Sequence, residues 1–470
     1  MDSKRANLLI ACLVTATTVM ILNETLLSVA LPAIMADFHL SADIAQWLST
    51  GFMLTMAVVI PVTGYIQQVL PTRTIFITSV VLFLVGTFVA ALAPGFMVVL
   101  VGRILQAAGT AIIIPLLMTV VLTIVEPSSR GSVMGIITVA IAVAPTVGPT
   151  LSGLILSFAT WHWLFWIMLV LGILVFFAGL RLLVNVGEVR RIPLDILSVV
   201  LSALGFGGLV YALSSISAVV EHGNKIPVFV GIAGVVLLAV FVLRQLRLVT
   251  TYGPLLDVRV LKERNFTLGM CAILGGFGVI IGVSMVLPLY LQGSVHVSEI
   301  LTGLVVLPGG LLQGFMSPFI GRLYDRYGPR PLAIPGALVL CLGVWAFVFV
   351  VPSGKLSLII LSHILVALGM GLVMTPMMTA ALGALPKRLY SHGSAVLNTL
   401  QQLAGAAGTA LLIAMMTLGQ NSALESGVSL PEAMSHGTQV AFAVAGVIAI
   451  LVLVAVLFVR RPDDAPTPAE

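Results

Sequence analysis

Charged residues are scarce in this sequence, and their scarcity excludes most classes of soluble protein. Asp, Glu, Lys and Arg make up 8% of the 470 residues, whereas a soluble globular domain holds about 25%. Hydrophobic residues make up 60%, and the mean hydropathy is +1.19. No stretch is polar and long enough to form a separate soluble domain. The chain is therefore predicted to be an integral membrane protein whose function lies within its membrane-embedded part.

Sequence signatures of several functional classes are also missing. The phosphate-binding pattern G-x-x-x-x-G-K-[ST] does not occur, which argues against an ATP-driven pump. The H-E-x-x-H and G-x-S-x-G patterns of hydrolases are absent as well, so we expect no enzyme, no metal site and no cofactor. The three cysteines, Cys12, Cys271 and Cys341, fall in apolar segments and are interpreted as small buried hydrophobic residues.

A series of fourteen apolar segments fills nearly the whole chain. Each is about 20 or more residues long, the length that an α-helix needs to cross about 30 Å of hydrocarbon. The predicted fold is an all-α integral membrane protein with 14 transmembrane helices. The segments are 7–31, 47–70, 74–93, 96–125, 131–157, 161–185, 195–219, 226–248, 266–292, 299–321, 331–351, 356–381, 396–419 and 437–459.

Lys and Arg are distributed unevenly between the two sides of the predicted bundle. With the N-terminus in the cytoplasm, 19 of the 22 basic residues fall on the cytoplasmic side, while Lys225 and Lys355 fall outside and Arg103 falls within a span. This bias is the positive-inside pattern of membrane proteins, and it predicts that both termini are cytoplasmic. We attribute the net charge of +5 to membrane topology, so no nucleic-acid partner is expected.

The chain contains an internal repeat. A shift of 257 residues superimposes five identical pairs, namely His39 and His296, Ser41 and Ser298, Pro61 and Pro318, Gly64 and Gly321, and Arg73 and Arg330. This shift corresponds to eight spans, so the second span recurs as the tenth in the same orientation, which is a parallel repeat of the kind found in transporters. We expect a six-helix half at 1–185, two inserted helices at 186–250, a second six-helix half at 251–461 and a cytoplasmic tail at 462–470.

Two loops of this repeat resemble a known family. The segment GRLYDRYGPR at 321–330 is similar to the G-x-L-a-D-r-x-G-r-k loop between the second and third helices of a half in the major facilitator superfamily. Its counterpart GYIQQVLPTR at 64–73 has Gln68 in place of the family's Asp. The resemblance implies a gating role for these loops. Their matching residues are Gly64, Arg73, Gly321, Asp325, Arg326, Gly328 and Arg330.

Further segments resemble the fourteen-helix drug:proton antiporters of that superfamily, and among them the lincomycin-resistance exporters. The resemblance covers nearly the full chain and implies proton-coupled multidrug efflux, hence antibiotic resistance, in a bacterial cell membrane. It implies the lipid bilayer, protons and a small-molecule substrate as partners, a monomer, and the proton gradient as the energy source. A symporter or facilitator of the same fold, or a dedicated metabolite exporter, is the alternative. The segments are ILNETLLSVALP at 21–32, VGRILQAAG at 101–109, VGPTLSGLI at 147–155, WHWLF at 161–165 and PLLDVRVLKERNF at 254–266.

The fifth span is rich in residues that weaken or crowd a helix. Pro145, Gly148, Pro149 and Gly153 remove side chains or backbone hydrogen bonds. We expect a hinge or a tight seal between the halves here, and the ordinary enrichment of Gly and Pro in membrane helices is the alternative.

One acidic residue is predicted to lie deep in the membrane. Glu24 comes one residue after Asn23, which occupies the position of the family's Asp. A charge near the bilayer centre costs about 2.5–3.5 kcal/mol or more. Arg103 is the one base expected at depth, and both residues lie about seven residues, or about 10 Å, from the outer ends of their spans.

We expect Glu24 and Arg103 to form a proton-coupling site. Burial favours the neutral form of a carboxyl group and a nearby guanidinium favours its charged form, so a modest movement would switch the proton. A static ion pair that holds two helices together is the alternative. His363 occupies the position equivalent to Arg103, because GRILQAAG at 102–109 aligns with SHILVALG at 362–369. Since histidine titrates near neutral pH, His363 is a second candidate, with a hydrogen-bonded helix histidine as the alternative.

Apolar, adaptable side chains with a few polar groups suit a cavity for lipophilic substrates. Each such residue alone is also consistent with ordinary packing. The candidate substrate-binding residues are Asn23, Trp47, Met53, Gln106, Tyr290 and Gln313.

Overall fold

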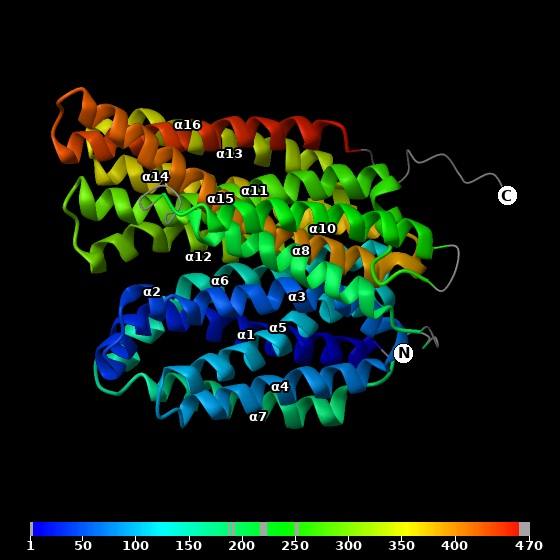
Figure 1. Cartoon of the computed structure of the whole chain (residues 1–470). Coiled ribbons are helices and arrows are strands. Elements are labelled where there is room, and N and C mark those ends of the chain that lie inside the picture. Colours follow the sequence, from blue (N-terminus) through cyan, green and yellow to red (C-terminus); the bar gives the residue numbers. More distant parts are fainter. Residues whose placement is uncertain (1–2, 187–188, 190–192, 217–222, 250–252, 460–470) are drawn as a thin grey trace.

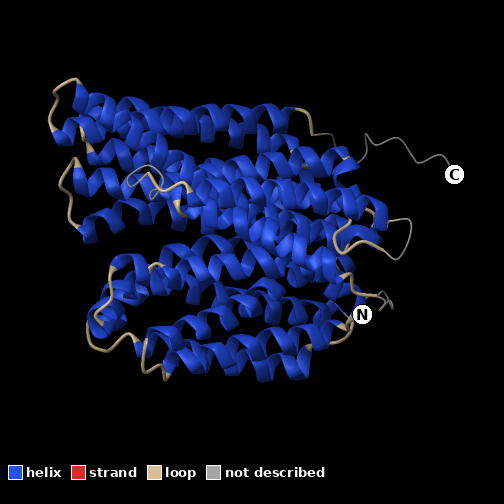
Figure 2. Cartoon of the chain, viewed as in Figure 1, coloured by secondary structure: helices blue, strands red, loops and turns tan. Residues whose placement is uncertain are grey.

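The protein is built of helices, and no strand occurs among the residues that the structure describes (Figure 2). The computed structural model describes residues 3–186, 189, 193–216, 223–249 and 253–459. The predicted tail at 462–470 lies outside the described residues. The prediction of an all-α fold is confirmed for the described chain.

Six long helices near the N-terminus form a unit that we call the first bundle. A one-turn helix, α2 (Ala42–Ala45), and a 3-10 turn, η1 (Pro127–Ser129), connect some of them and were not predicted from the sequence. The helices of the first bundle are α1 (Ser3–Phe38), α3 (Trp47–Val69), α4 (Thr72–Ala91), α5 (Phe96–Ile124), α6 (Arg130–Leu156) and α7 (His162–Leu182).

Two helices and then a second set of six complete the chain. The inserted pair consists of α8 (Ile196–Ser214) and α10 (Ile226–Leu248), and it is followed by a 3-10 turn, η2 (Val258–Lys262). The turns η3 (Val351–Ser353) and η4 (Lys387–Leu389) lie within the second bundle. The helices of the second bundle are α11 (Arg264–Gly293), α12 (Glu299–Tyr327), α13 (Arg330–Val350), α14 (Leu356–Gly383), α15 (Tyr390–Glu425) and α16 (Leu430–Leu457).

Thirteen helices in the described part of the chain are long and apolar enough to cross a membrane. The helix α6 is 27 residues long, but the side chains of residues 142, 145 and 146 lie outside the described part. Only its section Val147–Leu156 counts as an apolar helix, and that section is shorter than a span. The chain is therefore a multi-pass membrane protein, and the fourteenth span stays a prediction.

The long helices run back and forth, so that α1 begins and α16 ends at the same end of the molecule (Figure 1, right). We call this end the base and the opposite end the far end. The first bundle lies below the second in Figure 1. The two bundles meet where α6 packs against α12 and α3 packs against α15, and α8 packs against both α3 and α15. The inserted pair thus contacts both bundles.

The internal repeat recurs in the backbone. His39 and His296, which the shift of 257 residues superimposes, are the non-glycine residues with positive φ in the described chain, at 51° and 58°. Arg73 donates a hydrogen bond to the Leu180 carbonyl oxygen of α7 (2.8 Å), and Arg330 donates one to the Val459 carbonyl oxygen after α16 (2.6 Å). The third helix of each bundle is therefore tied in the same way to the end of the sixth.

Glycines bring neighbouring helices into backbone contact at equivalent places in both bundles. A Cβ added at Gly109 of α5 would lie 2.5 Å from the Ser79 carbonyl oxygen of α4. A Cβ added at Gly369 of α14 would lie 2.4 Å from the backbone nitrogen of Leu340 in α13. Because lipid tails give helices no hydrophobic reason to associate, close packing through small residues supplies much of the stability of membrane bundles.

The charge asymmetry and the helix order together predict which ends of the helices face the cytoplasm. In a cysteine-free background, cysteines at Asn224 and Ser435, both at the far end, should react with a membrane-impermeant maleimide added to intact cells. A cysteine at Glu263, which is exposed at the base, should react only after permeabilisation. Labelling of the Glu263 position in intact cells would contradict the predicted topology.

Candidate functional site

The strongest polar contact between the two bundles joins Asp325 of α12 to the first turn of α6. The backbone N–H of Gly131 donates to Oδ1 (2.7 Å), and the backbone N–H of Ser132 donates to Oδ2 (2.8 Å). The Ser132 hydroxyl also donates to Oδ2. A helix N-terminus presents unpaired N–H groups and a partial positive charge, so a carboxylate from the other bundle is well placed to bind there.

The backbones meet closely at the same place. A Cβ added at Gly321 would lie 2.1 Å from the Gly131 carbonyl oxygen, and a Cβ added at Gly135 would lie 2.4 Å from the Ser317 carbonyl oxygen. Glycines therefore allow α6 and α12 to approach until Asp325 reaches the backbone of α6.

Arg130 adds a second tie at the base. Its guanidinium donates to the carbonyl oxygens of Leu122 (2.7 Å) and Val125 (3.3 Å) at the end of α5. It also donates to the hydroxyl of Tyr390 in α15 (3.2 Å). One side chain thereby satisfies carbonyls at a helix end of the first bundle and reaches the second bundle.

Three more hydrogen-bonded pairs join the bundles. They are Gln68 with His392 (3.0 Å), Thr375 with Thr138 (3.1 Å) and Ser394 with the Pro115 carbonyl oxygen (3.1 Å). Each of these residues lies in the half of its helix nearer the base. These hydrogen bonds between the two bundles all lie on the base side, and we call this set of contacts the base seal.

Glu24 and Asn23 lie beyond the base seal, in the half of α1 nearer the far end. Glu24 is partly exposed, whereas Asn23 is buried and its Nδ2 has no hydrogen-bond partner. Thr25 donates to the Ala144 carbonyl oxygen of α6 (3.2 Å). The acid therefore lies where α1 meets the predicted hinge helix.

Arg103 lies in the half of α5 nearer the far end, and its side chain is buried within the first bundle. The guanidinium donates to Gln106 Oε1 (3.1 Å) and lies over the Phe52 ring, 4.2 Å from its centre. Gln106 in turn donates to the Thr87 hydroxyl (2.9 Å). Since Nε of Arg103 has no partner, the charge is held by one hydrogen bond and one aromatic face.

Glu24 and Arg103 interact through their charges without direct contact. The electrostatic attraction between them acts on both groups. The ion pairs closer than 4 Å among the described residues are Asp195 with Arg244 and Asp257 with Arg259. Glu24 and Arg103 are thus neighbours, but they do not form the static contact pair that was one interpretation of the sequence.

The fifth long helix packs tightly beside Glu24. A Cβ added at Gly148 would lie 2.2 Å from Thr25 Oγ1, so Gly148 is required for the contact between α6 and α1. Pro149 is partly buried one residue later. A Cβ added at Gly153 would meet nothing within 4 Å. Pro145 lies within α6, but its side chain is outside the described part.

His363 is buried in α14 at the position equivalent to Arg103. Its Nδ1 has no hydrogen-bond partner, and a Cβ added at Gly309 of α12 would lie 2.4 Å from that atom. The ring therefore occupies the space left by a glycine of the neighbouring helix, and its Nδ1 is available for a proton or a hydrogen bond.

The candidate substrate residues do not converge on one place. Trp47 is exposed and stacks on Tyr211 of the inserted pair, 6.3 Å between ring centres. Gln106 is fully buried beside Arg103. Met53 is exposed.

The candidates of the second bundle lie elsewhere. Tyr290 is buried, and its hydroxyl donates to the Val351 carbonyl oxygen. It also borders a far-end cavity of about 450 Å³. Gln313 is partly buried in α12.

The loop residues of the repeat have distinct positions at the base. A Cβ added at Gly64 would lie 3.3 Å from the Ala395 side chain and 3.5 Å from His392, so this glycine lies at the base seal. Gly328 ends α12 with a φ of 78°, which favours glycine. Arg326 is exposed and lies over Tyr327. Arg73 and Arg330 tie helices within their own bundles.

Sequence reasoning missed three members of the site. Thr87 carries no motif, because a threonine in an apolar helix looks like any other packing residue, and Thr25 lies in the segment ILNETLLSVALP but was given no role from the sequence. The signal for His392 was indirect: Gln68 departs from the loop pattern, and the structure shows that the amide meets a histidine 324 residues later.

Comparisons with known proteins agree with the motifs. Residues 13–409 match the family model of the Major Facilitator Superfamily. The chain is 41% identical over 460 residues to the lincomycin resistance protein LmrB of Listeria innocua, covering 96% of each chain. It is 38% identical over 446 residues to LmrB of Bacillus subtilis, covering 93% of this chain and 92% of that protein. The crystal structure of the human organic anion transporter MFSD10 has the same fold, with a TM-score of 0.69 at 15% identity, covering 96% of this chain and 99% of that one.

The base seal predicts unequal effects for its two loops. Asp325→Asn removes the charge from a carboxylate that accepts three hydrogen bonds, and a hydrogen bond to a charged group contributes about 1.5–3 kcal/mol. Gln68→Ala removes one neutral contact, worth about 0.5–1.5 kcal/mol. We expect a cysteine at Thr138 to react with a maleimide from the base side about tenfold faster in the Asp325 variant than in the Gln68 variant. Equal rates would show that the Asp325 contact does not hold the seal.

Proposed function

Since this chain belongs to the major facilitator superfamily, whose members are transporters and not enzymes, we propose that it is a proton-coupled antiporter that exports lipophilic drugs by alternating access. The observation that carries the proposal is the position of Glu24. It is an acid in a membrane-spanning helix, on the far side of the base seal, and it feels the charge of Arg103 without touching it.

The chemistry of coupling follows from this separation. An acid in apolar surroundings favours its protonated form, and an approaching guanidinium favours the carboxylate. Thr25 and Gly148 link the Glu24 region to α6, which carries the base seal at its other end. A movement of α6 that breaks the seal therefore also changes the distance between Glu24 and Arg103. Glu24 therefore releases its proton in the same step in which the protein changes the side of the membrane to which it is open.

The base is cytoplasmic in this proposal. The distribution of Lys and Arg supports that orientation. The chain then crosses a bacterial cell membrane fourteen times, and both termini lie in the cytoplasm. The structure then represents a state closed to the cytoplasm, in which Glu24 exchanges protons with the outside. The proton gradient alone supplies the energy, and one chain is the working unit.

The substrate class is inferred from the relatives and from the chain. The two LmrB proteins carry lincomycin resistance in their names, which supports lincosamides and similar amphipathic drugs as cargo. Asn23 supplies a buried amide nitrogen without a partner, and Met53 supplies an exposed, adaptable apolar side chain. His363 is a second titratable group at the depth of Arg103, on the opposite bundle.

Direction of flux separates this function from a symporter or facilitator of the same fold. Cells that contain the protein should accumulate less drug than cells without it. Collapse of the proton gradient should raise drug accumulation in the cells that contain the protein. A dedicated metabolite exporter would leave drug accumulation unchanged.

The central prediction concerns Glu24→Gln, which keeps the side-chain size but cannot titrate. In inverted membrane vesicles, drug uptake driven by an imposed pH gradient should fall to background, while the variant still reaches the membrane and binds drug. Glu24→Asp should keep partial activity, because the acid survives with a shorter reach. Arg103→Ala should move the pH dependence of transport upward, since the carboxyl loses the cation that favours its charged form.

Loss of folding is a separate outcome with a separate control. If Glu24 has only a structural role, Glu24→Gln should reduce the amount of protein in the membrane, while the remaining protein couples normally. Gradient-driven uptake that persists per molecule of Glu24→Gln protein would contradict the coupling role and transfer it to His363.

A further inference from the structure

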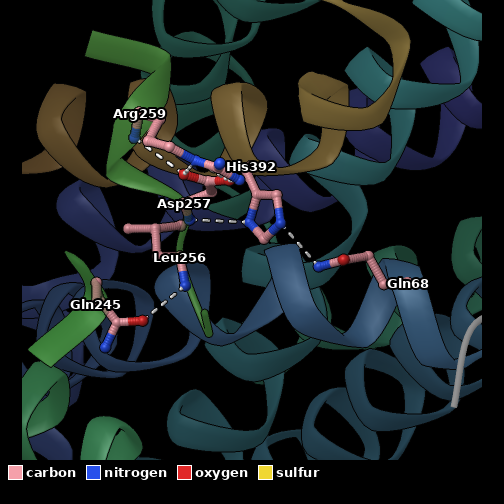
Figure 3. Close-up of polar contacts among 6 residues, drawn as sticks. All are labelled: Gln68, Gln245, Leu256, Asp257, Arg259 and His392. Atoms are coloured by element: carbon pink, nitrogen blue, oxygen red, sulfur yellow. Dashed lines mark hydrogen bonds and ion pairs between the residues drawn. The ribbon is translucent and has the colours of Figure 1, made fainter. Parts of the chain in front are cut away.

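The segment that connects the inserted pair to the second bundle is docked into the base seal. This connecting segment, residues 253–263, buries Leu255, Leu256, Asp257 and Val260 almost completely. At its start, the backbone N–H of Leu256 donates to Gln245 Oε1 of α10 (3.2 Å), and Gln245 donates to Ser198 of α8 (2.7 Å). The segment is therefore anchored directly to α10, as Figure 3 shows for Gln245 and Leu256, and through Gln245 to α8.

His392 of α15 holds the other side of the connecting segment. The backbone N–H of Asp257 points at Nδ1 of His392 (3.1 Å) (Figure 3). Gln68 of α3 places its amide nitrogen 3.0 Å from Nε2 of the same ring. That amide nitrogen also donates to the Gly64 carbonyl oxygen (2.9 Å), which fixes it as the donor end of the side chain. Both ring nitrogens of His392 thus face N–H donors.

A ring in this position cannot carry a second proton. Neutral imidazole has one lone pair and accepts one of the two bonds, whereas the imidazolium ion has an N–H on both nitrogens and accepts neither. Protonation would set an N–H of the ring against the backbone N–H of Asp257, which cannot rotate away. The docked position of the connecting segment therefore requires a neutral His392.

The charged groups around His392 act on it with opposite signs. From the connecting segment, the Asp257 carboxylate attracts a protonated ring and the Arg259 guanidinium repels it, while α3 faces the ring with the uncharged Gln68 and Gly64. Burial alone would raise the pKa of the Asp257 carboxyl, but hydrogen bonds from Arg259 outweigh it and hold that pKa below its usual range. Both oxygens of the Asp257 carboxylate thus accept hydrogen bonds from Arg259, and the attraction of Asp257 for a protonated ring does not remove the clash between N–H groups at Nδ1.

We propose that His392 is a proton-operated catch of the inner gate, which holds the connecting segment against α3 and α15 when neutral and releases it when it takes a proton from cytoplasmic water. Release removes the tie that the inserted pair makes across both bundles, and the base opens. The inserted helices thereby act as the anchor of this catch. The inference rests on the proposed alternating access, and its direction fits an antiporter, in which the protonated protein opens inward.

The test measures the width of the base as a function of pH. Spin labels on cysteines at Leu70, at the end of α3, and at Arg388, before α15, are exposed on opposite bundles. In lipid nanodiscs, the wild-type distance distribution should shift from a short to a long component as the pH falls from about 8 to about 4, a range that extends below the ordinary titration of histidine because donors face both ring nitrogens. His392→Asn keeps an acceptor near the position of Nδ1 but cannot be protonated, so its short component should persist throughout.

Two further variants keep the result interpretable. Gln68→Ala removes one of the donors that oppose protonation and should move the midpoint upward by about one pH unit, the equivalent of one neutral hydrogen bond. His436→Asn, at the far end of α16, should keep the wild-type response. A wild-type distance that ignores pH, or an unchanged pH response in His392→Asn, would overturn the proposal. The two proposals can fail separately. If drug causes no proton movement in vesicles but the distance shift still depends on His392, the antiport proposal is rejected and the proposal of a catch at His392 stands.

Discussion

The contact between Asp325 and the first turn of α6 joins the two bundles at the base, and in the proposed cycle it keeps this end of the molecule closed. A carboxylate that accepts backbone N–H groups from another bundle is strong only while the two backbones stay together, because Gly131 and Gly321 leave no side chain to fill a gap. The ties at Arg130, Thr138 and His392 join the same two bundles on the same side of the molecule. Two bundles joined in this way have two arrangements, with the base closed or open, which is the mechanical requirement for alternating access.

Because charge is scarce in this chain, the few ionisable groups within the membrane-spanning helices are the main candidates for a functional role. A charge in a membrane helix is costly unless it has a partner or a task. Arg103 has one hydrogen bond and the Phe52 ring, and Glu24 has the field of Arg103 without contact. Neither arrangement is the most stable one available to the pair, since a direct ion pair would satisfy both groups better. In the proposed mechanism this incompletely paired acid changes its proton, and that change connects the seal at the base with the chemistry at the far end.

The sequence predicted an all-α membrane fold, because apolar runs of span length are local features. Both Glu24 and Arg103 lie in the halves of their helices nearer the far end, as counting residues along each helix predicts. Rotation about the helix axis was not predictable, because helices that are apolar on all sides carry no amphipathic face. Gln106 was therefore expected in a substrate cavity and lies buried beside Arg103, and Tyr290 is bonded to Val351 within its own bundle. The contact between Gln68 and His392 was not predictable either, because the two residues are 324 positions apart in the sequence.

The most direct test of the account is a reversible lock across the base seal. The hydroxyls of Thr138 and Thr375 lie 3.1 Å apart on different bundles, so cysteines at both positions, in a cysteine-free background, are near enough to form a disulfide. Oxidation should abolish drug transport in vesicles, reduction should restore it, and each single cysteine variant should transport drug in both conditions. Transport at the normal rate by protein shown to be fully cross-linked would contradict the claim that the base must open in every cycle.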